Sequence, residues 1–350
     1  MTQTLNWAEV MARVPRERFI PDIIWRHDPD RLGNDLVPVD RRADPDTWTA
    51  IVAADGPVLT QVDNGHPAED GTGFEATSSC SDRQVVREML ELLAPEPGER
   101  VLEIGTGTGW NAALLAALGA AVTSVEIDES IARRAREILR PWGDICVLHG
   151  DGATPMVRGV DRVISTVGTR EIPWAWIEQT RVGGRIVAPL NGGWFPPGLA
   201  VLQRTKQGAH GKLAGPADFM RMRAQARSRA VPRTTDLVPA HVGTTTVHPY
   251  HLTGDRAAAI AIEQRTTDIR FTWRSPDDSA DGVLWLYGPE SWATIDATTA
   301  PPYEVEQAGP RLLVDEVLAA YEWWCKQGEP GIDNWRVSVD WAGQRITLDG

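Results

Sequence analysis

The sequence has few cysteines and no long apolar run. Its three cysteines, Cys80, Cys146 and Cys325, lie far apart in the chain, so they form neither the spacing of a metal site nor a disulfide framework. The seven histidines show no metal-like spacing either, and we expect no bound metal. No apolar stretch is long enough to span a bilayer, and no signal peptide is visible. These absences indicate a cytoplasmic protein that contacts no membrane.

Basic residues are also scarce. The chain has 35 Lys and Arg against 48 Asp and Glu, a net charge of −13, which argues against a general nucleic-acid binder because phosphate contacts need a basic surplus. One basic stretch remains, "RMRAQARSRAVPR", with Arg221, Arg223, Arg227, Arg229 and Arg233. It is either a docking strip for an acidic peptide or a solvated connecting helix, and its composition favours the helix.

The composition and the rhythm of the middle of the chain indicate an α/β fold. With 350 residues, 42% of them hydrophobic, the chain has the length of two globular domains. From residue 83 onward strands alternate with helices, joined by short turns. The expected helices are 83–93, 110–118, 129–139 and 174–180, and the expected strands are 100–104, 121–127, 146–149, 162–166 and 185–190. This alternation predicts a mostly parallel sheet covered on both faces.

The flanking regions have a different texture. Before the α/β region we expect a helix at 5–14, a loop at 28–46 and two short strands within 48–65. After about residue 235, four segments within 268–309 are typical of an antiparallel meander. A helix with Pro310 at its first position and a hairpin about Ala342-Gly343 follow. We therefore expect a domain over 1–234, with an insertion at about 28–73, and a smaller α+β domain over 235–350.

The stretch "VLEIGTGTGW" (101–110) places three glycines between an apolar strand and a helix. Glycine permits positive φ angles and a close approach of the backbone to a ligand. The helix N-terminus that follows offers free N–H groups. The pattern is G-x-G-x-G rather than the dinucleotide fingerprint G-x-G-x-x-G, with the acidic Glu103 two residues earlier. By itself it is compatible with any tight turn.

Two carboxylates follow at the ends of the next strands. Glu126 ends "AVTSVE", where it can accept both hydroxyl groups of a ribose, and Asp151 in "GDG" follows the next strand, where it can accept an adenine amino group. Because open α/β sheets bind ligands at these carboxyl ends, the ordered set predicts a nucleoside ligand. Thr166, Thr169 and Arg170 follow the fourth strand and are candidates for a substrate pocket.

These motifs resemble class I methyltransferases that use S-adenosylmethionine. More narrowly, "VPRERFIP", "VVREMLELL", "VLEIGTGTGW", "VEID", "GDG" and "GGRIVAPL" are similar, in order, to protein-L-isoaspartate O-methyltransferases. The resemblance covers about residues 10–200 and implies a Rossmann-like sheet with S-adenosyl-L-methionine as cofactor. It implies that Glu103, Gly105, Thr106 and Gly107 lie at the methionine part, Glu126 at the ribose, and Asp151 with Gly152 at the adenine.

The stretch "SSCSDRQ" (78–84) crowds hydroxyl groups before a helix. Ser81 and Gln84 fit a capping box, a purely structural use of one serine. The family resemblance aligns Ser81 with a serine beside the transferred methyl group, and Ser79 with a threonine. A carboxylate is already a nucleophile and needs no general base, so its methylation needs alignment and a hydrogen-bond donor, which a hydroxyl group supplies. Ser81 is thus a candidate catalytic residue, a cap, or both.

Two features differ from the repair enzymes of that family. Asp82 and Arg83 stand where the family has alanine and proline, and the chain continues for over a hundred residues after the sheet. The extension resembles long variants encoded with ribosomally made modified peptides: graspetides, lanthipeptides and lasso peptides. This implies esterification of an aspartate in a cyclised precursor peptide, followed by aspartimide formation, with 1–234 as the catalytic domain and 235–350 as the domain that recognises the peptide. The alternatives are general isoaspartate repair, a small-molecule methyltransferase and a non-catalytic peptide-binding scaffold.

Overall fold

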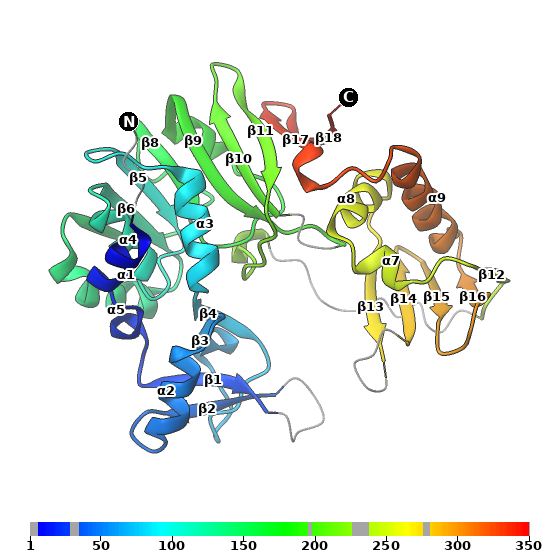
Figure 1. The fold of residues 1–350 in the computed structure, drawn as a ribbon, viewed down its shortest axis with the longest axis horizontal. Helices are drawn as coiled ribbons and strands as arrows, with labels where there is room; N and C mark the ends of the chain where they lie inside the picture. Colours follow the sequence, from blue (N-terminus) through cyan, green and yellow to red (C-terminus); the bar gives the residue numbers. More distant parts are fainter. Residues whose placement is uncertain (1–5, 29–34, 195–197, 226–237, 276–280, 350) are drawn as a thin grey trace.

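A nine-stranded mixed sheet forms the centre of the computed structural model, which describes residues 6–28, 35–194, 198–225, 238–275 and 281–349 (Figure 1). Its parallel strands are β5 (Arg100–Ile104), β6 (Ala121–Glu126), β7 (Ile145–His149), β8 (Val160–Ser165) and β9 (Thr180–Leu190). Its antiparallel strands are β10 (Gly198–Arg204), β11 (Gly208–Ala214), β17 (Trp335–Asp340) and β18 (Gly343–Leu348). The order across the sheet is β18-β17-β11-β10-β9-β8-β5-β6-β7.

Alternate residues of these strands face two separate cores, as expected for a sheet covered on both sides. Val101 packs into one core and its neighbour Leu102 into the other. The first core takes the apolar faces of α1 (Trp7–Arg13), α3 (Arg83–Leu93), α4 (Trp110–Ala117) and α5 (Glu129–Leu139). The second takes α6 (Trp174–Gln179), α8 (Arg256–Arg265) and α9 (Leu313–Lys326). The α/β rhythm expected between residues 83 and 190 is confirmed.

A small antiparallel sheet precedes the central one. Its strands, in the order β2-β1-β3-β4, are β1 (Ile23–His27), β2 (Leu36–Asp40), β3 (Val58–Val62) and β4 (Ala76–Cys80). The expectation of a loop over 28–46 is wrong, because residues 36–40 pair with β1. Of the two strands expected within 48–65, the second is confirmed as β3 and the first is wrong. Pro45–Ala53 forms helix α2, capped by Asp44, whose side chain accepts a hydrogen bond from the Thr47 amide.

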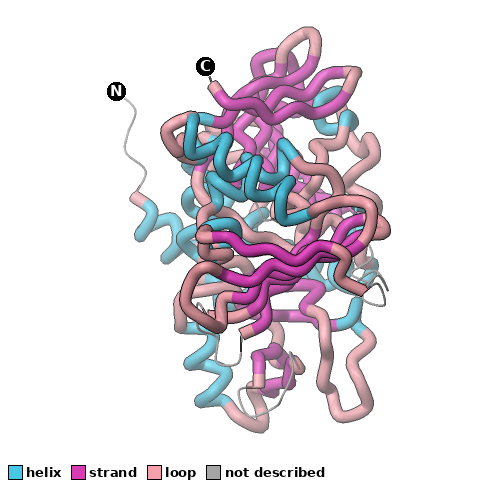
Figure 2. The backbone as a smooth tube through the Cα atoms, turned by 90° about the vertical axis from the view of Figure 1, so that its right-hand side faces the viewer, coloured by secondary structure: helices cyan, strands magenta, loops and turns pink. Residues whose placement is uncertain are grey.

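The C-terminal region contains the expected antiparallel meander. Its five-stranded sheet runs β12-β16-β15-β14-β13, formed by β12 (His241–Thr245), β13 (Arg270–Arg274), β14 (Val283–Gly288), β15 (Ser291–Asp296) and β16 (Tyr303–Ala308). A short helix, α7 (Tyr250–Thr253), precedes α8. Pro310 is not the first residue of α9, since the helix begins at Leu313. Figure 2 shows helices between this sheet and the strands of the central sheet.

The expected boundary at residue 235 does not separate two independent units. The terminal hairpin β17–β18 pairs with β11 and extends the central sheet instead of the C-terminal one. Residues 257–262 of α8 are all apolar and buried, with Ala258 and Ala261 in the core of the central sheet and Ala259 and Ile262 in the core of the C-terminal sheet. A helical stretch that is apolar all round is buried on all sides, so the two sheets share its packing.

In the described parts of the chain, no helix is both long and apolar enough to cross a bilayer. The same residues contain no group of three or more His, Cys, Asp or Glu side chains placed to hold a metal ion. All three cysteines are free thiols.

The terminal hairpin offers a test of its place in the core. Trp335 is 2% exposed, while Trp341, at the tip of the same hairpin, is 87% exposed. We expect Trp335→Ala to lower the free energy of unfolding by about 3–5 kcal/mol, because it removes a large buried side chain and leaves a cavity. Urea denaturation would measure this, with Trp341→Ala as the matched control at about 0.5 kcal/mol or less. Similar small losses for both variants would contradict the packing described.

Candidate active site

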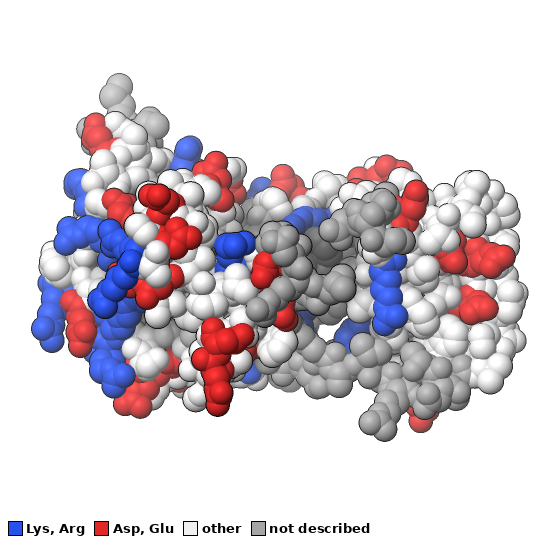
Figure 3. Space-filling model, turned by 90° about the horizontal axis from the view of Figure 1, so that it is seen from below, with Lys and Arg blue, Asp and Glu red and all other residues white. Residues whose placement is uncertain are grey.

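A cavity of about 1330 Å³ lies at the carboxyl ends of the parallel strands. Three parts of the chain form most of its lining: the turns after β5, β6, β7 and β8, the small N-terminal sheet with the serine-rich segment after it, and a segment after β11; Asn191 and Arg256 also line it. Seen from below, basic and acidic side chains lie interspersed on the exposed face of the molecule (Figure 3). Carboxyl ends of parallel strands are where open α/β sheets bind ligands, so we treat this cavity as the candidate active site.

The glycine loop forms the floor of the cavity. Gly105, Gly107 and Gly109 have φ angles of 89°, 51° and 88°, a region that side chains with a Cβ rarely adopt. At Gly105 a Cβ atom would also lie 2.8 Å from both Thr166 Oγ1 and Val167 Cγ1. Gly105, Thr106 and Gly107 all line the cavity, as the sequence predicts. The loop therefore presents bare backbone to whatever fills the cavity.

Glu126 ends β6 beside this loop. It is 6% exposed, and its carboxylate accepts hydrogen bonds from the Gly107 amide (2.9 Å) and the Asp128 amide (3.0 Å). Burial raises the pKa of Glu126, and the two amide donors oppose this rise. Asp151 and Gly152 line the cavity beyond it. The three positions predicted to hold a nucleoside are therefore brought together.

Glu103 lies elsewhere. Its side chain is fully buried behind the loop and does not line the cavity, so the expectation that it contacts the cofactor is not supported. It accepts hydrogen bonds from Asn111 Nδ2 (2.7 Å) and the Ser124 hydroxyl, and Ser124 Oγ lies 2.5 Å from Thr106 Oγ1. Burial raises the pKa of Glu103 to about 7. Alternate residues of a buried strand face opposite sides of the sheet, and Glu103 faces away from the cavity. Through Ser124, its carboxylate supports Thr106 of the glycine loop.

The serine-rich segment lies beside the glycine loop, since a Cβ atom at Gly107 would lie 3.6 Å from the Ser79 carbonyl oxygen. Ser79 lies in β4 and Ser81 just after it, and both line the cavity. The expected capping role of Ser81 is wrong. Asp82 caps α3, accepting hydrogen bonds from the amides of Gln84 (2.7 Å) and Val85 (3.1 Å). Among the described residues, neither the Ser79 nor the Ser81 hydroxyl group has a hydrogen-bond partner, so both remain available to a ligand.

A pair of charged side chains fixes the turn that carries Ser81. The Arg16 guanidinium donates to the carbonyl oxygens of Gly56 and Cys80, both at 2.8 Å, and the Gly56 amide donates to Asp82 at 2.6 Å. Burial acts to raise the pKa of Asp82, but its backbone donors hold it below the usual value. The hydrogen bonds of Arg16 and Asp82 therefore hold the turn before β3 against the turn after β4.

A segment that the sequence did not single out as a whole crosses the cavity. Residues 216–223, here called the covering segment, all line it. Gly168 holds the segment by two backbone hydrogen bonds, one to the Met220 carbonyl and one from the Met222 amide, both at 2.8 Å. The Arg223 guanidinium contacts Asp128 (3.5 Å) and Gln61 (3.3 Å). In the sequence, this segment is indicated only by the arginines at its end, Arg221 and Arg223.

Of the remaining residues that the sequence singled out, some line the cavity and others do not. Arg221 is not part of the connecting helix favoured from composition, because it bridges to Gly168 in an extended backbone, and Arg223 begins only a short 3-10 helix, η4 (Arg223–Gln225). Thr166 lines the cavity, whereas Thr169 and Arg170 do not. The remaining members of the arginine strip, Arg227, Arg229 and Arg233, lie outside the described residues.

The chain is similar in sequence to proteins of a known family. Residues 68–215 match the family model of protein-L-isoaspartate(D-aspartate) O-methyltransferase. The chain is 30% identical over 214 residues to a protein-L-isoaspartate O-methyltransferase of Gloeobacter violaceus, covering 60% of this chain and 86% of that protein. The chain belongs to the protein-L-isoaspartate O-methyltransferase family. It is 43% identical over 143 residues to a protein of the same name from Halorhodospira halophila, covering 39% of this chain and 64% of that one.

Membership sets the enzyme class and the cofactor. The chain is an S-adenosylmethionine-dependent carboxyl methyltransferase. The cavity fits this cofactor by its own geometry: a floor of positive-φ glycines that exposes backbone, a carboxylate at the second strand end for a ribose, and Asp151 at the third. The residues that would hold the cofactor are therefore Gly105 to Gly107, Glu126, Asp151 and Gly152.

The C-terminal region also has a counterpart in a solved structure. A structure titled protein-L-isoaspartate O-methyltransferase has the same fold with a TM-score of 0.52 and 17% identity, covering 98% of this chain and 95% of that one. The extension after the sheet is thus not a departure from all proteins of that name. By itself it does not argue against a repair activity.

The buried Glu103 predicts a pH-dependent stability. Its folded-state pKa of about 7 exceeds the ordinary value of 4.5, so the folded state binds the proton more tightly. The stability of the wild-type chain therefore falls as pH rises from about 4.5 to 7. Glu103→Gln removes this titration, and the free energy of unfolding of the variant should gain on that of the wild type between pH 5 and pH 8. Urea denaturation across this range tests the sign, and a constant difference would refute it.

Proposed function

We propose that this enzyme methylates the side-chain carboxylate of a normal aspartate in a ribosomally made peptide that is already constrained by cyclisation. The ester then allows the neighbouring backbone nitrogen to attack its carbonyl carbon. That nitrogen loses its proton, methanol leaves, and an aspartimide remains. The observation that carries most weight is that the Ser79 and Ser81 hydroxyl groups, which have no hydrogen-bond partner among the described residues, line the same cavity as the glycine loop.

The residues around the serines support a carboxylate acceptor. The only histidine among the described lining residues is His27, which comes from β1 in the small N-terminal sheet. Asp82 is engaged by three backbone amides. Methylating an alcohol or an ammonium group calls for a base to remove a proton, whereas a carboxylate needs none. S-adenosylmethionine would supply the methyl group, which forms a bond to the carboxylate oxygen as its bond to sulfur breaks and the electron pair stays on sulfur.

The shape of the cavity supports a bulky acceptor. Its volume of about 1330 Å³ includes both the part lined by the cofactor-binding residues and the part lined by the small N-terminal sheet. It extends from the glycine loop to the small N-terminal sheet, where Leu36, Leu59 and Phe74 form an apolar wall. Phe74 is 74% exposed, and an exposed aromatic side chain at the rim of a cleft suits contact with a peptide. A constrained peptide fits this wide cleft better than a small molecule does.

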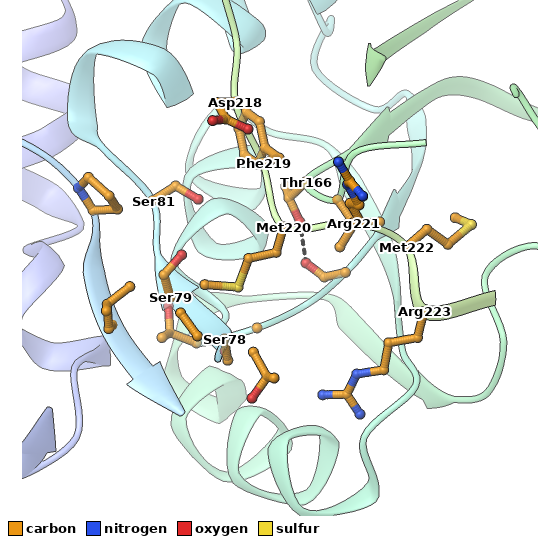
Figure 4. A pocket seen from close by; sticks show the side chains of 18 of the residues that line it. Ser78, Ser79, Ser81, Thr166, Asp218, Phe219, Met220, Arg221, Met222 and Arg223 are labelled. Atoms are coloured by element: carbon orange, nitrogen blue, oxygen red, sulfur yellow. Dashed lines mark hydrogen bonds between the residues drawn. The ribbon is translucent and has the colours of Figure 1, made fainter. Parts of the chain in front are cut away.

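In this proposal Ser81 and Ser79 orient the acceptor. Their hydroxyl groups can donate to one carboxylate oxygen without adding charge, and leave the other oxygen free to attack. Figure 4 shows both side chains on the same side of the cavity, with Met220 of the covering segment extending toward Ser79. An apolar thioether at this position would help to exclude water from the reacting groups.

A second candidate function is the repair of isoaspartyl residues in damaged proteins. The relatives carry that name, and a solved structure of that title matches almost the whole chain in fold. Both functions use the same methyl transfer to a carboxylate, and they differ only in the acceptor. The acceptor preference therefore decides between them.

The deciding experiment compares two peptides of the same composition. One is cyclised and contains a normal aspartate, and the other is linear and contains an isoaspartate. We expect the cyclised peptide to gain one methyl group and then lose methanol in mass spectrometry, with little turnover of the linear one. Equal or better turnover of the linear isoaspartyl peptide would favour repair.

The role of Ser81 can be tested without disturbing the helix cap, because Asp82 supplies that cap. We expect Ser81→Ala to keep its free energy of unfolding within about 0.5 kcal/mol of the wild type. Methyl transfer should fall on the order of a hundredfold, since one hydrogen-bond donor to a reacting oxygen is lost. Steady-state kinetics and urea denaturation on the same preparation measure both quantities.

Asp82→Ala is the matched control for this test. It should lose about 1 kcal/mol or more of stability through the missing cap, while Ser81 stays in the chain. A Ser81→Ala enzyme of near-normal activity would show that Ser81 does not orient the substrate, and Ser79→Ala would be the next variant to examine.

A further inference from the structure

The covering segment contains a second arginine besides Arg223. Arg221 lines the cavity, and its backbone is held in extended form by its bridge to Gly168. The next residue, Met222, is 5% exposed and packs into the core of the central sheet. Because side chains alternate along an extended backbone, Arg221 points away from that core and toward the cavity.

The Arg221 guanidinium has no ion pair or hydrogen bond among the described residues, although the chain carries a net charge of −13. No ion pair joins it to Asp218 of the same segment. By contrast, Arg223, two residues later, contacts both Asp128 and Gln61. Arg221 is therefore an uncompensated positive charge at the wall of the acceptor cleft, carried on a backbone that bridges to Gly168.

The chemistry of a guanidinium group indicates what it would bind. It pairs with a carboxylate through two parallel hydrogen bonds, which occupy both carboxylate oxygens. The carboxylate that is methylated must keep one oxygen free, so it is a poor partner for such a fork. In the view of Figure 4, Arg221 lies beside Thr166, across the cavity from Ser79 and Ser81. A carboxylate other than the reacting one suits this position.

We infer that Arg221 is a specificity-determining residue that binds a second carboxylate of the acceptor, carried by an acidic residue close in sequence to the methylated one. The inference rests on the proposed methylation of a peptide carboxylate. It narrows the substrate class to acidic peptides with at least two neighbouring carboxylates.

The test uses two cyclised peptides that differ in one residue. Both contain the acceptor aspartate, and its neighbour is glutamate in one and glutamine in the other. Binding to the enzyme saturated with S-adenosylhomocysteine is followed by fluorescence anisotropy of labelled peptides, and methyl transfer is followed separately by mass spectrometry. We expect the wild type to bind the glutamate peptide about tenfold more tightly, between the values typical of exposed ion pairs and of charge-assisted hydrogen bonds. This preference should shrink as salt is added.

Variants assign the preference to this residue. Arg221→Gln should bind both peptides equally, and Arg221→Lys should keep part of the preference, because it retains the charge but not the fork. Arg170→Gln is the matched control. It removes the same charge from an exposed residue that bridges to Glu171 and does not line the cavity, and it should retain the wild-type preference. Unchanged melting temperatures would show that all three variants are folded.

The outcomes separate this inference from the proposed function. A preference in binding that disappears in Arg221→Gln supports the inference, even if neither peptide is methylated, in which case the proposed reaction fails. Methylation of both peptides without any preference supports the reaction and overturns the inference. A preference that survives in Arg221→Gln, or no measurable binding of either peptide, also overturns it.

Discussion

The site depends on one hydrogen bond, from the Gly107 amide to the Glu126 carboxylate (2.9 Å). It ties the turn after β5 to the end of β6, so the glycine floor and the candidate ribose acceptor keep a fixed relation. A buried carboxylate is costly unless donors satisfy it, and the Asp128 amide supplies the second one. Asp128 in turn caps α5 and pairs with Arg223. Burial acts to raise the pKa of Asp128, but hydrogen bonds and the nearby Arg223 hold it at about 2. The cofactor floor and the covering segment therefore belong to one network.

The part of the cavity that carries the serines depends on a different constraint, the hydrogen bonds of Arg16 and Asp82 that join the turn at Gly56 to the turn after β4. Arg16 is 3% exposed, and its Nε and Nη1 atoms have no hydrogen-bond partner among the described residues. A buried guanidinium with two unsatisfied donors costs free energy. It stays buried because it lies 5.7 Å from the centre of the Trp110 ring and holds two carbonyl oxygens. The serine hydroxyl groups are thus carried on a turn whose backbone is fixed by other residues, which leaves them free to contact a ligand.

The sequence predicted well where a local pattern decides the structure, and failed where tertiary context decides it. The α/β rhythm and the nucleoside positions follow from short apolar runs and the turns after them, and the structure brings them together. The Ser81 capping box failed because Asp82, an equally good cap, stands one residue nearer to the helix. The prediction that Glu103 contacts the cofactor is not supported, because the spacing of this residue from the glycines does not reveal which face of β5 it occupies. The pairing of β17 with β11 joins residues more than a hundred positions apart, and no local pattern reports such a contact.

This long-range pairing affects how the acceptor cleft is built. The C-terminal sheet packs on α8 and α9, and both helices also contribute to the core of the central sheet. Arg256, the first residue of α8, lines the cavity. A recognition module joined by a linker could reorient freely, but a wall that shares two cores with the catalytic sheet cannot move without breaking close packing. The cleft is therefore bounded on this side by a fixed surface. Selectivity for an acceptor must then come from the side chains that project from that surface and from the covering segment, and not from the docking of a separate domain.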